Sequence, residues 1–260
     1  MRRGLLYQWE EKMGKNQKKK ARINKRIWKL AGGFAAITLA VSLILLVLGY
    51  FDVLPIVKDK PSESFLSDAQ ILRQDTELLG QGLELQGVGR YCGVYMEDGS
   101  MDQVSDVMMI RLKNTTQQDL QLAKLSLVYE GFTAEFEITN LPAGRTVIAL
   151  EKNRNPFADQ KYLSMSLSDV VFFEENMDAA AERYQLTGMD GALNLKNVSA
   201  NDISGDIYIY YKYIAAGELY GGVTFRAKLP GGVKAGEMRQ AAAEHFDPDS
   251  CLILAVTSGA

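Results

Sequence analysis

The sequence predicts a mainly β protein, in which an N-terminal transmembrane helix is followed by two tandem small β-sandwich units. Three observations lead to this prediction. One long segment near the N-terminus has no charge. Beyond Gly80, short runs of alternating apolar and polar residues are separated by glycine-containing turns, as in strands joined by hairpins. Part of this pattern then occurs a second time. A chain of 260 residues has room for one large domain or two small ones.

The uncharged segment comprises residues 30–51, LAGGFAAITLAVSLILLVLGYF. About 20 apolar residues are needed to cross the hydrocarbon core of a bilayer. Trp28 and Tyr50 lie at the two ends, where interfacial aromatic residues are common. A cleavable signal peptide has a shorter apolar region and a cleavage site between small residues, and this segment has neither. We therefore expect an uncleaved signal-anchor that forms a single-pass transmembrane helix.

The charge distribution predicts the orientation. Residues 1–29 carry a net charge of +9, and the rest of the chain carries −12. The 15 residues before Leu30 hold 8 Lys and Arg, whereas the 15 after Phe51 hold only Lys58 and Lys60. Because positive charge stays on the cytoplasmic side, we expect a cytoplasmic N-terminus and an extracellular C-terminal domain at the cell membrane. Anionic lipid explains the basic tail, so no nucleic acid partner is expected.

Residues 52–260 divide into segments that differ in composition and in hydrophobic pattern. Residues 52–79 contain Pro55 and Pro61 and are predicted to be a stalk or linker, with one short helix over 64–79. Residues 80–175 form the first predicted β-sandwich unit, and 191–260 form the second. The connector, 176–190, contains DAAAERY and is predicted to be a short helix.

Within the first unit, alternation predicts several strands. Their ranges are 107–113, 120–129, 133–138, 146–150 and 162–173. Residues 235–246 in the second unit, AGEMRQAAAEHF, leave two alternatives open. Their position in the pattern favours a strand, and their three consecutive alanines favour a helix.

The two units share a repeated pattern. Leu112-Lys113-Asn114 matches Leu195-Lys196-Asn197 at an offset of 83, and Gly144 matches Gly236 at an offset of 92. Nine additional residues are therefore expected in the second unit, near 217–222, because hairpin tips tolerate insertions. The pattern predicts an internal duplication.

This order of strands and turns resembles bacterial extracytoplasmic immunoglobulin-like (Ig-like) modules of the FxLYD type. The residues that carry the resemblance are Asn114, Tyr129, Gly131, Gly144, Asn197, Tyr211 and Gly236. The resemblance covers roughly 105–150 and 191–256. It implies two tandem small Ig-like β-sandwich units that form a non-catalytic, surface-exposed module of the bacterial cell envelope, without site residues.

Catalytic constellations are sparse. His245 is the single histidine, which excludes a two-histidine metal site. A comparison of His245 and Cys251 with sortases fails, because no arginine follows Cys251. The glycine-rich segment 80–93 matches neither a dinucleotide fingerprint nor a P-loop. The acidic turns 97–102 and 202–206 lack EF-hand spacing and are interpreted as solvated turns. We expect no catalytic residue, no metal and no cofactor, and therefore no enzyme.

The candidate partner-binding face is aromatic. Alternation places Tyr208 and Tyr210 on one face of a strand, beside Tyr220 in the following hairpin. The opposite face holds Ile207, Ile209, Tyr211 and Tyr213. An exposed tyrosine stripe would suit a protein or glycan partner. The alternative is cross-strand aromatic pairing that only stabilises the sheet.

Two further features remain open in the sequence. Cys92 and Cys251, the only cysteines, could form one disulfide in an exported domain or remain two buried thiols. Asn114 and Asn197 fit the glycosylation sequon, but both precede turns, where asparagine is favoured structurally, and we prefer the structural interpretation.

The resulting expectation is a membrane-anchored extracytoplasmic binding or structural module whose partner is another envelope protein or a glycan. The alternative is a transmembrane sensor that signals through the short basic tail. An envelope enzyme is the third class, and it would require a pocket with convergent acidic groups.

Overall fold

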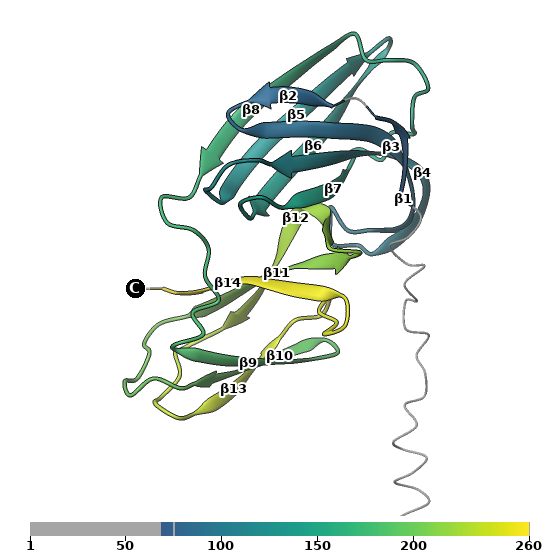
Figure 1. Cartoon of the computed structure of the whole chain (residues 1–260). Helices are drawn as coiled ribbons and strands as arrows, with labels where there is room; N and C mark the ends of the chain where they lie inside the picture. The colour runs from purple at the N-terminus through teal and green to yellow at the C-terminus, as the bar shows by residue number, and fades with distance from the viewer. Residues whose placement is uncertain (1–68, 75, 260) are drawn as a thin grey trace, which may run out of the picture. The chain divides into compact units, whose positions relative to one another are not determined.

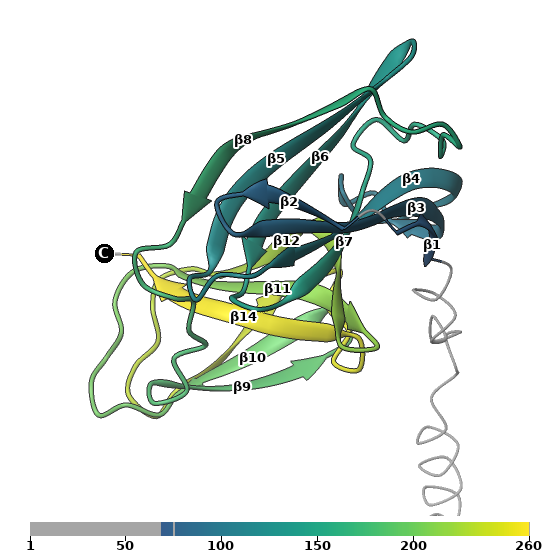
Figure 2. The same ribbon diagram turned by 45° about the horizontal axis from the view of Figure 1, so that its top comes forward.

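The computed structural model describes residues 69–74 and 76–259, which form fourteen strands (Figures 1 and 2). The predicted tail 1–29, the predicted membrane segment 30–51 and most of the predicted stalk lie outside the described residues. Within the described part of the chain, no helix has the length and apolar character needed to span a membrane.

The strands fall into two sets of six, here named repeat 1 and repeat 2. Repeat 1 consists of β3 (Leu83–Tyr95), β4 (Asp102–Asn114), β5 (Leu120–Tyr129), β6 (Phe132–Leu141), β7 (Thr146–Leu150) and β8 (Ser164–Phe172). Repeat 2 consists of β9 (Tyr184–Met189), β10 (Ala192–Asn197), β11 (Ile207–Ala215), β12 (Glu218–Leu229), β13 (Met238–Ala242) and β14 (Cys251–Ser258). Two short strands, β1 (Ala69–Arg73) and β2 (Glu77–Gly80), pair with β3.

The two repeats have the same strand connectivity. In repeat 1, β4 lies between β3 and β7, and β5 lies between β6 and β8. In repeat 2, β10 lies between β9 and β13, and β11 lies between β12 and β14. Each repeat is thus two three-stranded layers built in the same order, which supports the predicted duplication.

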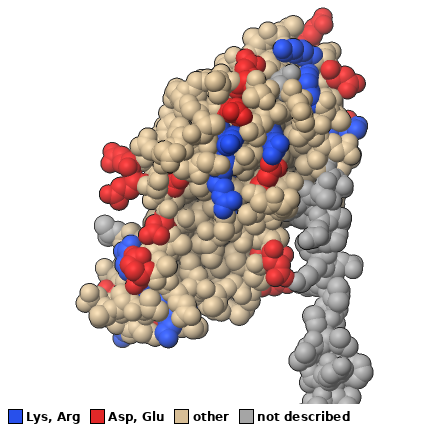
Figure 3. Space-filling view, viewed as in Figure 1, with Lys and Arg blue, Asp and Glu red and all other residues tan. Residues whose placement is uncertain are grey.

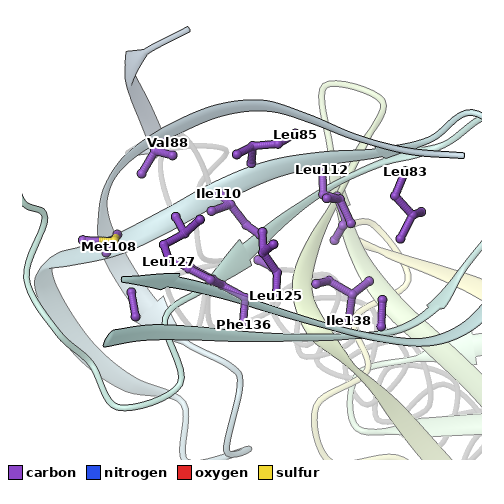
Figure 4. Close-up of a cluster of buried hydrophobic side chains, with 14 of the residues drawn as sticks. Leu83, Leu85, Val88, Met108, Ile110, Leu112, Leu125, Leu127, Phe136 and Ile138 are labelled. Carbon is purple, nitrogen blue, oxygen red and sulfur yellow. The ribbon is translucent and has the colours of Figure 1, made fainter. Parts of the chain in front are cut away.

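Alternating side chains fill a core between the two layers of each repeat. In repeat 1, Leu85 and Ile110 of one layer face Leu125 and Phe136 of the other (Figure 4). In repeat 2, the core contains Leu193, Leu195, Ile207, Ile209 and Tyr211. Burying each large apolar side chain contributes roughly 1.5–3 kcal/mol, so these clusters hold the layers together.

Asn114 closes the first turn from inside the protein. Its side chain is fully buried, and its Nδ2 donates to the carbonyl oxygens of Gln118 at 2.8 Å and Leu141 at 3.1 Å. Its Oδ1 accepts from the amide and the hydroxyl of Thr116, at 3.0 and 2.8 Å. This asparagine therefore ties the end of β4 to the turn and to the end of β6.

Asn197 makes the same set of contacts in repeat 2. It too is fully buried, and its Nδ2 donates to the carbonyl oxygens of Asn201 at 2.8 Å and Val233 at 3.1 Å. Its Oδ1 accepts from the amide and the hydroxyl of Ser199, at 3.0 and 2.7 Å. These partners lie 83 and 92 residues after those of Asn114, so the equivalence read from the sequence holds atom by atom. The structural interpretation of both asparagines is confirmed.

The nine additional residues of repeat 2 are distributed over its hairpin. The offset is 83 at Asn114 and Asn197, 86 at the hairpin glycines Gly131 and Gly217, and 92 beyond the hairpin. Three of these residues therefore precede the hairpin turn and six follow it. Three of the six form a bulge in β12, because the pairing advances from Tyr211–Phe225 to Tyr213–Tyr220. All nine additional residues were expected near 217–222, and this position is correct only for the three that form the bulge.

The predicted helical connector at 176–190 is wrong. This range holds irregular chain and turns up to residue 183 and then β9, and Ala180 has a positive φ of 50°. Pairing of β9 with β10 decides the structure, since it buries Tyr184 in the core of repeat 2. The helix propensity of three alanines is too small to oppose that burial.

Strands also replace other expected helical segments. The described end of the predicted stalk forms β1 and β2, so the short helix expected up to residue 79 is wrong for these residues. The open alternative at 235–246 is decided in favour of a strand, because β13 pairs with β10. In both places, pairing with a neighbouring strand outweighs the small local helix propensity.

The two repeats share one sheet. The N-terminal end of β12 runs parallel to β7, with Leu219 opposite Val147 and Tyr220 opposite Ile148. This pairing joins layers of both repeats into an eight-stranded sheet with the order β1-β3-β4-β7-β12-β11-β14 and β2 beside β3. A third apolar cluster covers the join, where Tyr213 and Tyr220 pack with residues of β3, β4 and β7.

Lys212 holds the β12 bulge from one side. The side chain is fully buried, and its Nζ donates to the carbonyl oxygens of Gly221, Gly222 and Val223 at 2.7, 2.6 and 2.7 Å. An ammonium group has three donors and no acceptor, so these three carbonyls satisfy it completely.

Glu97 of repeat 1 holds the same bulge through its amides. Its carboxylate accepts from the amides of Gly222 at 2.8 Å and Val223 at 3.0 Å, and also from the amide of Leu150 in β7 at 2.7 Å. One carboxylate thus binds strands of both repeats. A carboxylate that accepts several backbone amides is well suited to its ionised form.

The environment of each group disfavours its charge unless the other is present. Burial lowers the pKa of Lys212, to about 7, and the Glu97 carboxylate opposes that change. Burial also raises the pKa of Glu97, against the backbone amides and Lys212. Removing either partner would leave the other as an isolated buried charge, which costs several kcal/mol.

Glycine is required in this bulge by close approach. A Cβ on Gly222 would lie 2.0 Å from the carbonyl oxygen of Glu137 in β6. Gly221 has a φ of +84°, and a Cβ there would lie 2.8 Å from the Met96 side chain. The absence of side chains lets β12 lie against repeat 1, where the hydroxyls of Thr139 and Thr224 bond at 3.0 Å.

Replacing Asn197 by alanine should lower the free energy of unfolding by about 2–3 kcal/mol, because two buried carbonyls lose their donor. Asn194→Ala is the matched control, since Asn194 is on the same strand and only half-buried, and its effect should stay within about 0.5 kcal/mol. Denaturant unfolding of the full-length protein in detergent measures both. Equal effects of the two substitutions would contradict the role assigned to Asn197.

Glu97 and Lys212 should be strongly coupled in stability. Glu97→Gln and Lys212→Met should each lower the free energy of unfolding by about 3–5 kcal/mol. The double variant should lose less than the sum, by about 1–3 kcal/mol, because it removes both charges together. The exposed Lys228→Met serves as a control and should cost no more than about 1 kcal/mol. Additivity of the Glu97 and Lys212 substitutions would show that the two groups do not compensate each other.

Candidate binding site

A cavity of about 410 Å³ lies where the two repeats meet. Its walls come from β5 and β6 of repeat 1, from β11 and β14 of repeat 2, and from the segment 173–183 between β8 and β9. That segment runs beside β14 in both ribbon views (Figures 1 and 2), and the amide of Val256 donates to the carbonyl oxygen of Asp178 at 2.9 Å. The volume falls within the usual range for ligand sites, about 300–1,000 Å³.

Four of the uncharged polar side chains that line this cavity come from strands, each from a different one. They are Gln121 of β5, Asn140 of β6, Tyr210 of β11 and Thr257 of β14. None of the four side chains has a hydrogen-bond partner among residues 69–74 and 76–259. Asn140 and Tyr210 are half-buried, while Gln121 and Thr257 are exposed. Their donors and acceptors are therefore available to a ligand.

Three of the other polar and charged lining groups are occupied within the protein, whereas the exposed carboxylate of Glu175 has no partner among the described residues. Arg183 contacts Glu182 at 3.3 Å, and the Asp178 carboxylate accepts from the amide of Ala180 at 2.9 Å. Asn176 is held by the amide of Asp119 at 2.9 Å. No histidine, cysteine or serine lines the cavity. The arrangement can bind and orient a ligand, and it has no nucleophile paired with a base.

Two residues that line the cavity have positive φ values. Asn140 and Ala180 line the cavity with φ values of 48° and 50°, in the left-handed region that non-glycine residues rarely adopt. Such residues persist where the surrounding structure fixes them, and they often occur at binding sites. Asn140 belongs to β6 of repeat 1, and Ala180 belongs to the segment that connects the two repeats.

The predicted tyrosine face is formed in part. Tyr208 and Tyr210 lie on the same face of β11, as alternation predicts, and both are half-buried. Tyr210 lines the cavity, whereas Tyr208 lies outside it between the Arg226 guanidinium, 4.9 Å from the ring centre, and the Lys228 ammonium, 5.7 Å from it. The two neighbouring tyrosines therefore have different surroundings.

Tyr220 does not belong to this face. It is only 8% exposed and packs in the cluster that joins the repeats, with its ring beside Tyr213 rather than Tyr208. The prediction that Tyr220 extends the exposed stripe is therefore wrong. The cause is the register that the hairpin turn sets, which pairs Ala215 with Glu218 and Tyr213 with Tyr220, so Tyr220 lies on the face of Tyr213.

The two cysteines are free thiols, so the disulfide left open by the sequence is not formed. The Cys92 sulfur accepts from the amide of Asp106 at 3.4 Å, beside a second cavity of about 300 Å³ that also includes Arg90. The Cys251 sulfur lies 3.7 Å from the carbonyl oxygen of His245. Because this contact uses the backbone of His245, the two side chains form no catalytic pair.

The acidic turns are used within the protein. Asp98 and Asp102 bind Arg154 at 2.7 and 3.0 Å, and Asp206 binds Lys228 at 2.6 Å. Among the residues that the structure describes, no cluster of three or more His, Cys, Asp or Glu side chains could hold a metal ion. Acidic and basic side chains are interspersed on the face shown in Figure 3, without a broad patch of one sign among the described residues.

Sequence reasoning missed most of the site. Only Tyr210 was expected at a binding surface, and Gln121, Asn140 and Thr257 belong to strands without a local motif. The buried pair Glu97 and Lys212 was also missed. One signal for Lys212 existed, since a lone lysine interrupts the otherwise uncharged strand IYIYYKYIA. Nothing in the sequence pointed to Glu97 as its counterpart.

The two thiols should differ in reactivity. Burial raises the pKa of Cys251 to about 12, so roughly one molecule in ten thousand carries the reactive thiolate at pH 8. Native full-length protein treated with iodoacetamide at pH 8 should be alkylated at Cys92 at least about tenfold faster than at Cys251, as measured by peptide mass spectrometry. In guanidinium chloride the two rates should converge. Resistance of both cysteines to alkylation until a reductant is added would contradict the free thiols.

Comparisons with known proteins add no assignment. The chain matches no protein-family model, no curated protein and no solved structure.

Proposed function

We propose that this protein is a non-catalytic, membrane-anchored extracytoplasmic binding module. Its partner would bind in the cavity between the two repeats. The observation that carries the proposal is the convergence of four unengaged, uncharged polar side chains from four strands on one cavity of about 410 Å³. The uncharged segment 30–51 and the basic tail before it support the anchored topology.

An Ig-like character of the repeats belongs to the same proposal. Each repeat pairs two three-stranded antiparallel layers around one core, which is the general plan of a small β-sandwich. The resemblance to FxLYD-type modules rests on Asn114 and Asn197, and these asparagines occupy equivalent buried positions. Such modules present binding surfaces on a rigid frame.

The chemistry around the cavity favours binding over catalysis. General acid–base catalysis needs a titratable group aimed at the reacting atoms. The carboxylate of Asp178 instead caps its own turn, and the guanidinium of Arg183 contacts Glu182. The groups that remain available are amides and hydroxyls, which recognise a ligand without activating it, and the exposed carboxylate of Glu175, which is paired with no nucleophile in the lining.

The test is site-specific photocrosslinking in the native cell. Full-length protein with p-benzoylphenylalanine in place of Tyr210 should crosslink to a component of the outer membrane face or the cell wall. The same crosslinker in place of the exposed Thr187, on the far layer of repeat 2, should give little product. The photoproducts are compared by electrophoresis and mass spectrometry.

Two results would contradict the proposal. Equal crosslinking from both positions would show that the cavity is not a specific site. Crosslinking from position 210 to a cytoplasmic component would overturn the predicted orientation of the chain.

A further inference from the structure

We infer that the cavity between the repeats binds uncharged sugar residues of an envelope glycan. This inference rests on the proposed binding function and names the class of its ligand. Three properties of the lining carry it, namely the kind of free polar group, the state of the charged groups and the apolar surface beside them.

The free polar groups match hydroxyls. The amides of Gln121 and Asn140 each offer both donors and an acceptor, and the hydroxyls of Tyr210 and Thr257 do the same. A sugar hydroxyl also donates and accepts. A ligand with only donors, such as an ammonium group, would leave the amide N–H groups and hydroxyl protons without partners, and a ligand with only acceptors would leave the amide oxygens without partners.

The charged groups disfavour an ionic ligand. Arg183 contacts Glu182, so binding an anion would first break a contact inside the protein, and Asp178 is bonded within its turn. Neighbouring Lys228 is likewise occupied by Asp206 at 2.6 Å. The exposed carboxylate of Glu175 also lines the cavity and has no partner among the described residues, so it repels an anion and can accept a hydrogen bond from a sugar hydroxyl. Moving a charged ligand out of water also carries a desolvation cost. An uncharged ligand avoids this desolvation.

The cavity also has an apolar wall. Phe173 and Met177 of the connecting segment lie among its lining residues, together with the ring of Tyr210. The ring face of a pyranose carries C–H groups that pack on aromatic and thioether surfaces, while its edge carries hydroxyls. Apolar and polar lining groups therefore correspond to the two kinds of surface on a sugar.

The dimensions favour a short stretch of glycan over a folded protein. A volume of about 410 Å³ is near the lower end of the range for ligand sites. A stable protein partner would need an interface of about 1,200–2,000 Å², most of it outside the cavity. Walls from both repeats enclose the site, and the bonds of Glu97 to strands of both repeats keep them at a fixed separation.

The experiment is saturation-transfer NMR on full-length protein in lipid nanodiscs. The probes are neutral trisaccharides of glucose, N-acetylglucosamine and rhamnose, with trigalacturonate and trilysine as charged comparators. At least one neutral trisaccharide should receive saturation and the charged probes should not. Tyr210→Ala and Gln121→Ala should each weaken the affinity of that trisaccharide by about tenfold.

Tyr208→Ala is the matched control. Tyr208 is on the same strand and the same face as Tyr210, but it lies outside the cavity, so affinity should change by less than about twofold. Thermal unfolding of each variant checks that the fold persists. Should Tyr210→Ala fail to fold, Gln121→Ala still tests the site, because Gln121 is exposed.

Two results would overturn the inference. One is the absence of saturation transfer to every neutral trisaccharide at 10 mM, on the order of the weakest specific affinities. The other is an equal loss of affinity in the Tyr208 and Tyr210 variants. If photocrosslinking from position 210 still captures an envelope component, the binding function stands and only the ligand class fails.

Discussion

The arrangement of this protein depends on two opposite charges, Glu97 and Lys212, that hold a bulge in β12 from its two sides. Lys212 binds the carbonyls of Gly221, Gly222 and Val223, and Glu97 binds two of their amides together with an amide of β7. Each charge is tolerable in the interior only because the other is present. The bulge turns the N-terminal end of β12 toward repeat 1. Because this end pairs with β7, the two repeats share a sheet.

Duplication followed by divergence explains how the shared sheet arose. The turns closed by Asn114 and Asn197 are identical in their hydrogen bonds, so both repeats keep the same frame. Their hairpins differ, because β5 and β6 pair without interruption near their turn, whereas β12 has three additional residues. The bulge that these residues form is bonded to Glu97 of repeat 1 and adjoins the joint between the repeats, which is the pairing of β12 with β7. The cavity with its four available polar side chains is a consequence of that joint.

A rigid joint has a functional meaning for a binding module. A ligand that contacts β5, β6, β11 and β14 at once requires these strands to hold a constant separation. If the repeats moved freely, each binding event would lose the conformational entropy of that motion, and the affinity would be lower. The shared sheet, the third apolar cluster and the buried pair remove that cost before the ligand arrives.

The local pattern of the sequence predicted five of the six strands of repeat 1 and missed β3, whose glycines hide the alternation. Strands β5 and β7 begin and end where alternation and turn residues placed them, because hairpin turns restrict the backbone strongly. The duplication was also visible, since Asn114 and Asn197 each close a turn with neighbours in the chain. The predicted anchor lies outside the described residues and stays a prediction. Tertiary structure decided the rest: β9 in place of a helix, the burial of Tyr220, and the meeting of Glu97 with a bulge 125 residues away. These outcomes depend on which strands pair across long separations, and single-strand periodicity carries no information about such pairing.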